Sequence, residues 1–362
     1  MALTIKDKLI AKMRNRFKWV PKRAVLPGMI AFVFVPSLAF AFSYGPMLSV
    51  QPENGTLSGG ASVAVDAGAS GGQSMRFGSG SGVPVIADFP TLASVGPATD
   101  PTIPYSGDCY FDASQSGEII DSRILDCDSA GGVRFAVDAT NIVFRNSIIY
   151  GQMFTIGNTP GDPGAEQDTR DPVFTVEDSD IIQATTIDFQ DRALCCSHYV
   201  VKRSLIQGTH SGLAVHNNAI LEDNYITTDG TNTHQSGGRI LKNAIFRGNT
   251  VTCMAVPGYG PDGGCSAAMV FYRENLSGQP AAAYNLTIEG NYFKRPAGDG
   301  PYNATRFAGC DTNNDCINIT FTGNLFDLGW MTDGNEFPND AGDVFSGNYW
   351  TDGQPAASGE SR

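Results

Sequence analysis

The sequence predicts an all-β protein built as a right-handed parallel β-helix, because one short strand motif recurs and no amphipathic helix follows residue 42. The motif occurs nine times, as IIDSRI, FRNSII, VEDSDI, VKRSLI, LEDNYI, FRGNTV, IEGNYF, FTGNLF and FSGNYW. Its shared Ser or Asn stands at positions 122, 147, 179, 204, 224, 249, 291, 324 and 348. The basal spacing of 20 to 25 residues is typical of a solenoid with three short strands per turn, and longer intervals indicate loops inserted on its flanks.

The apolar residues of each repeat keep fixed offsets from the shared Ser or Asn. Leu221 and Ile226 in LEDNYI match Phe246 and Val251 in FRGNTV, so equivalent side chains stack into one core. The Ser or Asn falls where a strand must turn, and such side chains hydrogen-bond along the coil axis and tolerate left-handed dihedrals. We therefore expect a structural ladder within a single-stranded solenoid of about nine rungs over residues 107–352.

Residues 1–41 have the order of a secretory signal peptide. Eight Lys and Arg residues precede an apolar run from Ala24 to Phe42, and Ala39-Phe40-Ala41 fits the small-x-small cleavage rule. A retained membrane anchor is the alternative, because the run is nearly long enough to span a bilayer. Cleavage would leave 16 basic and 36 acidic residues, a net charge near −20. Such a surface repels nucleic acid and anionic lipid, and we expect a secreted monomer whose partner is an extracellular polysaccharide.

Eight cysteines in an exported chain predict disulfides. Close spacing favours three local pairs, namely Cys109 with Cys127, Cys253 with Cys265 and Cys310 with Cys316. The adjacent Cys195 and Cys196 either form a vicinal disulfide or stay reduced. The sequence has no CxxC pair, which argues against structural zinc.

Two flanking regions differ from the repeats in composition. Residues 42–82 contain ENGTL from Glu53, a Gly- and Ala-rich run and MRF from Met75, which together resemble the opening strands of jelly-roll carbohydrate-binding modules. About 30 residues are too few for a whole module, so we interpret them as a hairpin that caps an open end of the solenoid. Residues 83–106 are predicted as a Pro- and Gly-rich linker and residues 353–362 as a disordered tail.

The candidate chemistry lies on neighbouring rungs rather than in a local motif, since the sequence lacks HExxH and Walker patterns. Alignment of LEDN with FRGN places Thr209-His210 beside His234-Gln235, Ser211 beside Ser236, Gly212 beside Gly237 and Ala214 beside Arg239. Stacked rungs lie about 4.8 Å apart. His210, His234 and Arg239 can therefore share one groove, and we take them as candidate catalytic residues.

Other polar and aromatic residues lie on the same rungs or in the loops inserted beside them. The candidate substrate-binding residues are Ser236, His216, Lys242, Tyr259, Tyr272, Arg273 and Arg192. Carboxylates suit a calcium ion, and the candidate ligands are Asp191, Asp262 and Asp299.

Three segments resemble a family of secreted right-handed β-helix proteins that carry an H-x-S-G-x-R element in this rung. They are HQSGGR from His234 to Arg239, LKNAIFRGNTVTC up to Cys253, and GGCSAA from Gly263. The resemblance covers roughly residues 46 to 352, and the β-helix itself resembles the pectate lyase superfamily. Carried over residue by residue, it implicates His234, Ser236 and Arg239. Gln235 departs from the acidic residue that often stands there, which weakens the case for a carboxylate base.

Three classes of function fit these residues. A polysaccharide lyase would use His234 as the base and Arg239 or Ca²⁺ to neutralise a uronate carboxylate. A glycoside hydrolase on a neutral glycan would need two carboxylates across a groove, such as Asp191 with Asp229 or Glu274 with Asp262. A non-catalytic protein could bind glycan through aromatic side chains, for example Tyr259, Tyr272, Tyr292, Tyr302 and Trp330.

Overall fold

The computed structural model describes residues 61–65, 73–77, 83–155, 172–183, 192–228, 235–254, 265–271, 283–295, 303–306, 316–327 and 342–358. It divides the chain into two units, Met1–Phe77 and Gly78–Arg362. In the first unit, β1 (Ala61–Val65) and β2 (Gln73–Phe77) form an antiparallel hairpin. The predicted hairpin is thus present, and its capping role stays a prediction. The expected signal peptide, residues 1–41, lies outside the described residues.

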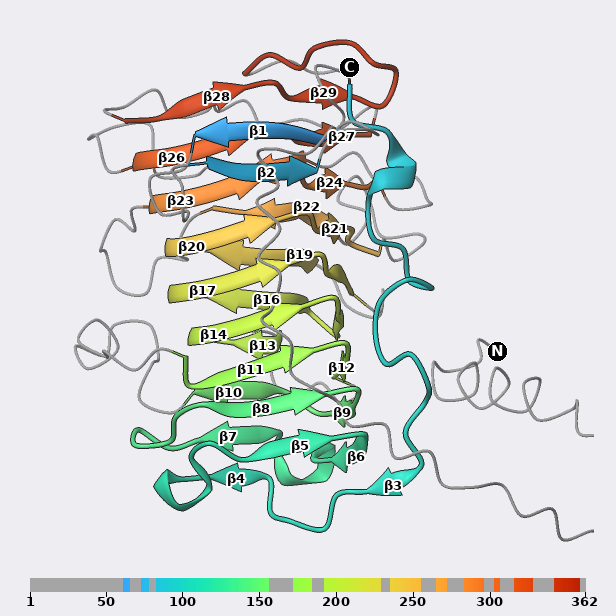
Figure 1. The fold of residues 1–362 in the computed structure, drawn as a ribbon, viewed down its shortest axis with the longest axis vertical. Helices are drawn as coiled ribbons and strands as arrows, with labels where there is room; N and C mark the ends of the chain where they lie inside the picture. Colours follow the sequence, from blue (N-terminus) through green and yellow to red (C-terminus); the bar gives the residue numbers. More distant parts are fainter. Residues whose placement is uncertain are drawn as a thin grey trace, which may run out of the picture. The chain divides into compact units, whose positions relative to one another are not determined.

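The second unit is a right-handed parallel β-helix whose strands stack rung upon rung in three parallel sheets (Figure 1). The first sheet contains β4 (Tyr110–Phe111), β7 (Val133–Phe135), β10 (Met153–Thr155), β13 (Arg192–Cys195), β16 (Ser211–Val215), β19 (Gln235–Ile240), β22 (Cys265–Val270) and β25 (Asn303–Arg306). We call it the eight-stranded sheet.

The other two sheets complete each coil. The nine-stranded sheet contains β5 (Ile119–Asp121), β8 (Ile142–Arg145), β11 (Phe174–Glu177), β14 (Ser197–Lys202), β17 (Asn217–Glu222), β20 (Lys242–Arg247), β23 (Tyr284–Glu289), β26 (Ile317–Thr322) and β28 (Val344–Ser346). The ten-stranded sheet contains β3 (Ile103–Pro104), β6 (Arg123–Asp126), β9 (Ile148–Tyr150), β12 (Asp180–Ile182), β15 (Leu205–Gly208), β18 (Tyr225–Thr228), β21 (Thr250–Val251), β24 (Tyr292–Phe293), β27 (Leu325–Phe326) and β29 (Tyr349–Trp350).

Helical structure in the described residues is limited to three short 3-10 turns, η2 (Ile86–Asp88), η3 (Ala113–Gln115) and η4 (Asp128–Ala130). No helix within the described ranges has the length and apolar character needed to cross a membrane.

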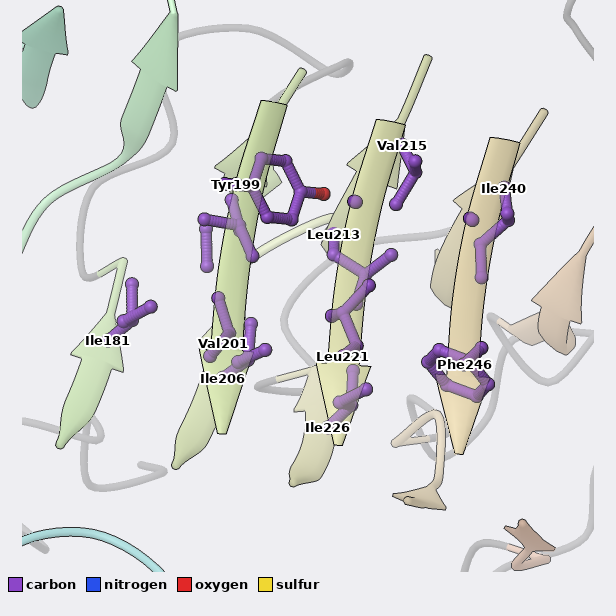
Figure 2. Close-up of a cluster of buried hydrophobic side chains, with 14 of the residues drawn as sticks. Ile181, Tyr199, Val201, Ile206, Leu213, Val215, Leu221, Ile226, Ile240 and Phe246 are labelled. Carbon is purple, nitrogen blue, oxygen red and sulfur yellow. The ribbon is translucent and has the colours of Figure 1, made fainter. Parts of the chain in front are cut away.

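The core consists of apolar side chains that point into the coil and stack from rung to rung. Leu221 registers with Phe246 and Ile226 with Val251, as the repeat offsets predict, and all four are fully buried. Figure 2 shows this stacking for Ile181, Tyr199, Val201, Ile206, Leu213, Val215, Leu221, Ile226, Ile240 and Phe246. Each buried side chain of this size stabilises the fold by about 1.5–3 kcal/mol, so the stack, rather than any single rung, holds the structure.

The shared Ser and Asn side chains form one buried column of hydrogen bonds. The backbone N–H of each Asn donates to the Oδ1 of the next: Asn224 to Asn249 (3.0 Å), Asn249 to Asn291 (2.9 Å), Asn291 to Asn324 (2.9 Å) and Asn324 to Asn348 (2.9 Å). Serine hydroxyls continue the column at Ser204, Ser179 and Ser147. An unsatisfied buried donor costs about 1–3 kcal/mol, and the column supplies the acceptors that these turns need.

The left-handed residue of each turn is not the one that we expected. We expected the strand to turn at the shared Ser or Asn, which tolerates left-handed dihedrals, whereas the left-handed residue lies one position earlier. Gly248 has φ +66° before Asn249, and Asp223 has φ 58° before Asn224. The shared residue therefore serves as a buried hydrogen-bonding group, and the preceding residue makes the turn.

The first repeat is displaced by one residue from the predicted alignment. Ile120 registers with Phe144, so Arg123, not Ser122, takes the ladder position. The Arg123 N–H donates to Ser147 Oγ at 3.2 Å and ends the column there. The alignment followed the serine, while the register follows the buried apolar pair.

A second column of Asn side chains lies at the second residue of β20, β23 and β26 in the nine-stranded sheet. Asn285 Nδ2 donates to Asn243 Oδ1 at 2.9 Å, and Asn318 Nδ2 donates to Asn285 Oδ1 at 3.0 Å. All three have left-handed φ angles of 51° to 56°. His198 occupies the equivalent position of β14 with φ 60° and is buried, with its Nδ1 3.2 Å from Asn218 Nδ2. His198, one of the four histidines, therefore has a structural role.

Residues 83–106 pack along the β-helix, which their linker-like composition did not indicate. The Thr250 hydroxyl donates to the Pro90 carbonyl at 2.6 Å. The Phe89 ring lies 5.5 Å from the Tyr292 ring, and β3 pairs with β6 at the other end of the coil. Figure 1 shows this strap as the cyan trace beside the stacked strands.

The chain end also differs from the disordered tail that we predicted from residue 353 on. The Trp350 N–H donates to the Gln354 carbonyl at 2.9 Å, and the Ala356 N–H donates to the Asn348 carbonyl at 2.8 Å. The residues up to 358 thus fold back on β29, because its outer backbone groups need partners.

One outward row of the nine-stranded sheet alternates in charge along Asp121, Arg145, Glu177, Lys202, Glu222, Arg247 and Glu289. Ion pairs join Arg145 with Asp121 (2.9 Å), Lys202 with Glu222 (3.0 Å) and Arg247 with Glu289 (3.2 Å). Each exposed pair contributes at most about 1 kcal/mol. These cations are matched by carboxylates of their own sheet.

The buried column predicts a large stability loss when one member is removed. Asn249→Ala leaves the Asn224 donors without an acceptor, and we expect the free energy of unfolding to fall by about 3 kcal/mol. The matched control Asn285→Gly removes an exposed column amide and keeps the left-handed turn, so it should cost about 1 kcal/mol or less. Urea denaturation followed by circular dichroism measures both, and equal losses would contradict the assignment of the buried column.

Candidate functional site

The predicted register of the two central rungs is confirmed. Ser211 pairs with Ser236, and Ala214 pairs with Arg239, across β16 and β19. Arg192 on β13 registers with Ser211. The structure therefore brings Arg192, Ser211 and Ser236 into one row on the eight-stranded sheet, with the Arg239 position three residues further along, roughly 10 Å away at strand rise.

A short chain of hydrogen bonds organises the first row. Ser211 Oγ lies 3.0 Å from Ser236 Oγ and 3.4 Å from His210 Nδ1. The His210 carbonyl accepts a bond from the Ser236 N–H at 3.3 Å. His210 and both serines are buried. The imidazole of His210 thus contacts the hydroxyl of Ser211 beside it, and Ser211 in turn contacts Ser236 on the neighbouring rung. A preorganised base needs such fixed neighbours.

The glycines of this rung are explained by backbone approach. A Cβ at Gly212 would lie 2.5 Å from the Gly237 carbonyl oxygen, and a Cβ at Gly237 would collide with the Ala268 carbonyl oxygen. At Gly238 a Cβ would lie 2.7 Å from the Leu213 side chain. The SGGR run therefore lets rungs approach closely while Arg239 projects from the sheet.

The second row joins Arg239 to a vicinal disulfide. Cys195 and Cys196 are disulfide-bonded, which decides between the two states that the sequence left open. Both are buried and pack with Ala214, whose register partner is Arg239. Arg239 itself is 9% exposed, so its guanidinium lies in a largely desolvated setting.

The remaining disulfides agree with local pairing as far as they are described. Cys109 bonds to Cys127, as predicted. Cys253 and Cys316 are also disulfide-bonded, and their predicted partners, Cys265 and Cys310, have no described side chain.

His216 and Lys242 lie at the corner where the eight-stranded sheet passes into the nine-stranded sheet. The His216 N–H donates to the Cys196 carbonyl at 2.6 Å. Lys242 begins β20, and its Nζ lies 5.6 Å from the centre of the Tyr284 ring. Both side chains therefore border the end of the row that contains Arg239.

Several predicted site residues lie outside the described residues. They are His234, Tyr259, Tyr272, Arg273, Asp191, Asp262 and Asp299, together with Asp229, Glu274, Tyr302 and Trp330 from the alternative functions. Tyr292, which we considered as a glycan-binding aromatic, is described and is only 5% exposed. It packs under Phe89, and burial together with its hydrogen bond to Asp327 raises the pKa of its phenol. Tyr292 is therefore a core residue of the strap contact.

The described part of the site is cationic and polar. Among the described residues of β13, β16 and β19 and of the turns beside them, the ionisable side chains are Arg192, His210, Arg239 and His216, and none is a carboxylate. This contrasts with the net charge of −13 for the chain.

A metal fits the described site poorly. Within the described ranges, the one grouping with metal-ligand spacing is Cys195, Cys196 and His216. Its donors are nitrogen and disulfide sulfur, whereas Ca²⁺ takes oxygen ligands. The described residues therefore give no support to a calcium site, and the three predicted aspartates stay a prediction.

Comparisons of the chain with protein-family models, with curated proteins and with solved structures find no match. The parallel β-helix is shown, while membership of a particular family stays a prediction.

The cysteine assignments predict the outcome of peptide mapping. Denatured, non-reduced protein should show no free thiol, and digestion should release one peptide in which Cys195 and Cys196 are bonded to each other. Thiol titration and mass spectrometry of the digest measure this. A titratable thiol, or Cys195 bonded to a distant cysteine, would contradict the structure of this row.

Proposed function

We propose that this protein is a secreted polysaccharide lyase that cleaves a uronate-containing glycan by β-elimination on the outer face of β13, β16 and β19. The observation that carries the proposal is the position of Arg192 on β13 and Arg239 on β19, with His210 just before the intervening β16, in a strongly acidic chain. The fold fits polysaccharide-active enzymes in general, and disulfides are typical of exported proteins.

β-Elimination needs two functions that these side chains can supply. A base removes the C5 proton beside the uronate carboxylate, and that C–H electron pair forms a C4=C5 double bond. The C4–O bond breaks with its electron pair on the glycosidic oxygen, which leaves as the hydroxyl of the other fragment after it takes a proton from water or from the protonated base. The base is an imidazole, with His234 assigned from the sequence and His210 held in place beside Ser211 and Ser236. Histidine suits this role because a neutral imidazole is abundant near pH 7, whereas arginine stays protonated.

The second function is neutralisation of the uronate carboxylate, which makes the neighbouring proton acidic. Arg239 is the group for this role, because a guanidinium can grip a carboxylate with two parallel hydrogen bonds. Its burial strengthens that interaction, since charges attract more strongly where water is excluded. The polysaccharide on either side of the cleaved bond is then positioned by the candidate substrate-binding residues Ser236, His216, Lys242 and Arg192.

A glycoside hydrolase is less well supported. That chemistry needs two carboxylates, and the described residues of the face contain none. A non-catalytic glycan-binding protein is the third possibility, and the assay below separates all three.

The test is incubation of the mature protein with a panel of uronate polysaccharides, following the absorbance of the unsaturated product with and without a calcium chelator. We expect product from at least one uronate. Reducing ends released from a neutral glycan without unsaturated product would establish hydrolysis instead. Binding without any cleavage would establish the non-catalytic function.

Substitutions at the two functions should lower turnover without unfolding the protein. Arg239→Lys keeps the positive charge and loses the two parallel N–H donors of the guanidinium. We expect this variant and His210→Gln to reduce kcat/KM by about 100-fold. We expect His234→Ala to abolish turnover. Arg145→Lys on the charge-alternating row is the matched control and should leave kcat/KM unchanged. Wild-type kcat/KM in Arg239→Lys and His234→Ala would remove both residues from the mechanism.

A further inference from the structure

The Arg239 row continues along the eight-stranded sheet toward the N-terminal end of the coil. Tyr110 on β4 registers with Arg134 on β7, Arg134 with Phe154 on β10, and Phe154 with Cys195 on β13. The Cys195 position is followed by Ala214 and then by Arg239. One outward row therefore runs from Tyr110 through Arg134 and Phe154 to the proposed site.

The guanidinium of Arg134 is exposed and lies over the Phe154 ring, 5.2 Å from its centre. It forms no ion pair with any residue in the described part of the chain. Arg145, Arg203 and Arg247 differ, since each pairs with an Asp or Glu. In so acidic a chain, Arg134 presents a positive charge that its described surroundings do not neutralise.

Phe154 is itself fixed by packing. It is half-buried against the cluster of Cys195, Cys196 and Ala214. A cation is attracted to an aromatic face, so the Phe154 ring favours the observed position of the guanidinium, where the Arg134 side chain stays exposed to solvent. Tyr110, at 48% exposed, adds an open aromatic ring one rung further along.

We infer that the outer face of β4, β7 and β10 is a second binding area, for the part of an acidic polysaccharide that extends beyond the cleavage site. Arg134 receives a uronate carboxylate, Tyr110 packs against a sugar ring, and Phe154 is a positioning residue that holds Arg134. The inference rests on the proposed function for the chemistry of the polymer.

The geometry suits an extended glycan that runs along the coil axis. From β7 to β19 the sheet order passes through β10, β13 and β16, so Arg134 and Arg239 are four rungs apart, about 19 Å at the usual strand spacing. Several sugar residues span that distance. A short oligomer at Arg239 cannot reach Arg134, whereas a longer chain engages both.

The test compares oligo-uronates of two lengths, a trisaccharide and a hexasaccharide, with Arg134→Gln and Arg145→Gln. The two arginines lie on consecutive strands of one coil, are both exposed, and lose the same charge. For the hexasaccharide we expect Arg134→Gln to raise KM about tenfold with kcat unchanged. The trisaccharide should be unaffected, and Arg145→Gln should behave as wild type with both.

Phe154→Leu keeps the apolar packing and removes the aromatic face. It should raise KM for the hexasaccharide about threefold, and this increase should vanish in the Arg134→Gln background. Tyr110→Ala should likewise affect only the longer substrate. Identical KM values for Arg134→Gln and wild type on the hexasaccharide would overturn the inference and leave the lyase intact.

Affinity electrophoresis in gels that contain a poly-uronate gives a readout independent of turnover. Retardation that weakens in Arg134→Gln but not in Arg145→Gln supports the binding area even if no uronate is cleaved, in which case only the lyase function fails. Retardation by a neutral glycan alone, unchanged in Arg134→Gln, would overturn the inference.

Discussion

Rung-to-rung hydrogen bonding in a fixed register is the interaction on which the other features of this protein depend. A parallel coil can slide by a residue only if its buried side chains leave the core, and the buried Ser and Asn column adds a second penalty, because each turn donor needs the acceptor of the next rung. The column runs without a break from Ser147 to Asn348. Side chains on the outside therefore repeat at a spacing that the backbone sets.

This regularity is what allows a site to form without a local motif. Arg192, Ser211 and Ser236 are 19 and 25 residues apart in the chain and adjacent in the sheet. The regular stacking of strands also gives the nine-stranded and eight-stranded sheets different charged residues on their outer faces. Arg145, Lys202 and Arg247 on the nine-stranded sheet are paired with carboxylates. The described strands of the eight-stranded sheet contain no carboxylate. The acidic chain thus keeps one cationic face.

The fold and the central register could be predicted because the repeats there are equal in length, as for Ser211 and Ser236. The first repeat was misplaced because the alignment matched Ser122 with Ser147, whereas the register that lies one residue away pairs the buried Ile120 with Phe144. The alignment of Phe154 with Cys195 could not be derived, since the insertion between these strands hides where the coil resumes. The burial of Tyr292 depends on Phe89, a contact with no sequence pattern.

The strap of residues 83–106 changes how such a coil can come apart. In a solenoid whose repeats touch only their neighbours, the terminal rungs open independently of each other. Here Phe89 packs with Tyr292 and Leu325 on late rungs, while β3 pairs on the first, so opening either end disturbs the same segment. The strap also precedes the rungs in the sequence, so it is synthesised before them, whereas its contact residue Leu325 is synthesised near the end. The contacts between the strap and the late rungs can therefore form only after nearly the whole chain has been synthesised.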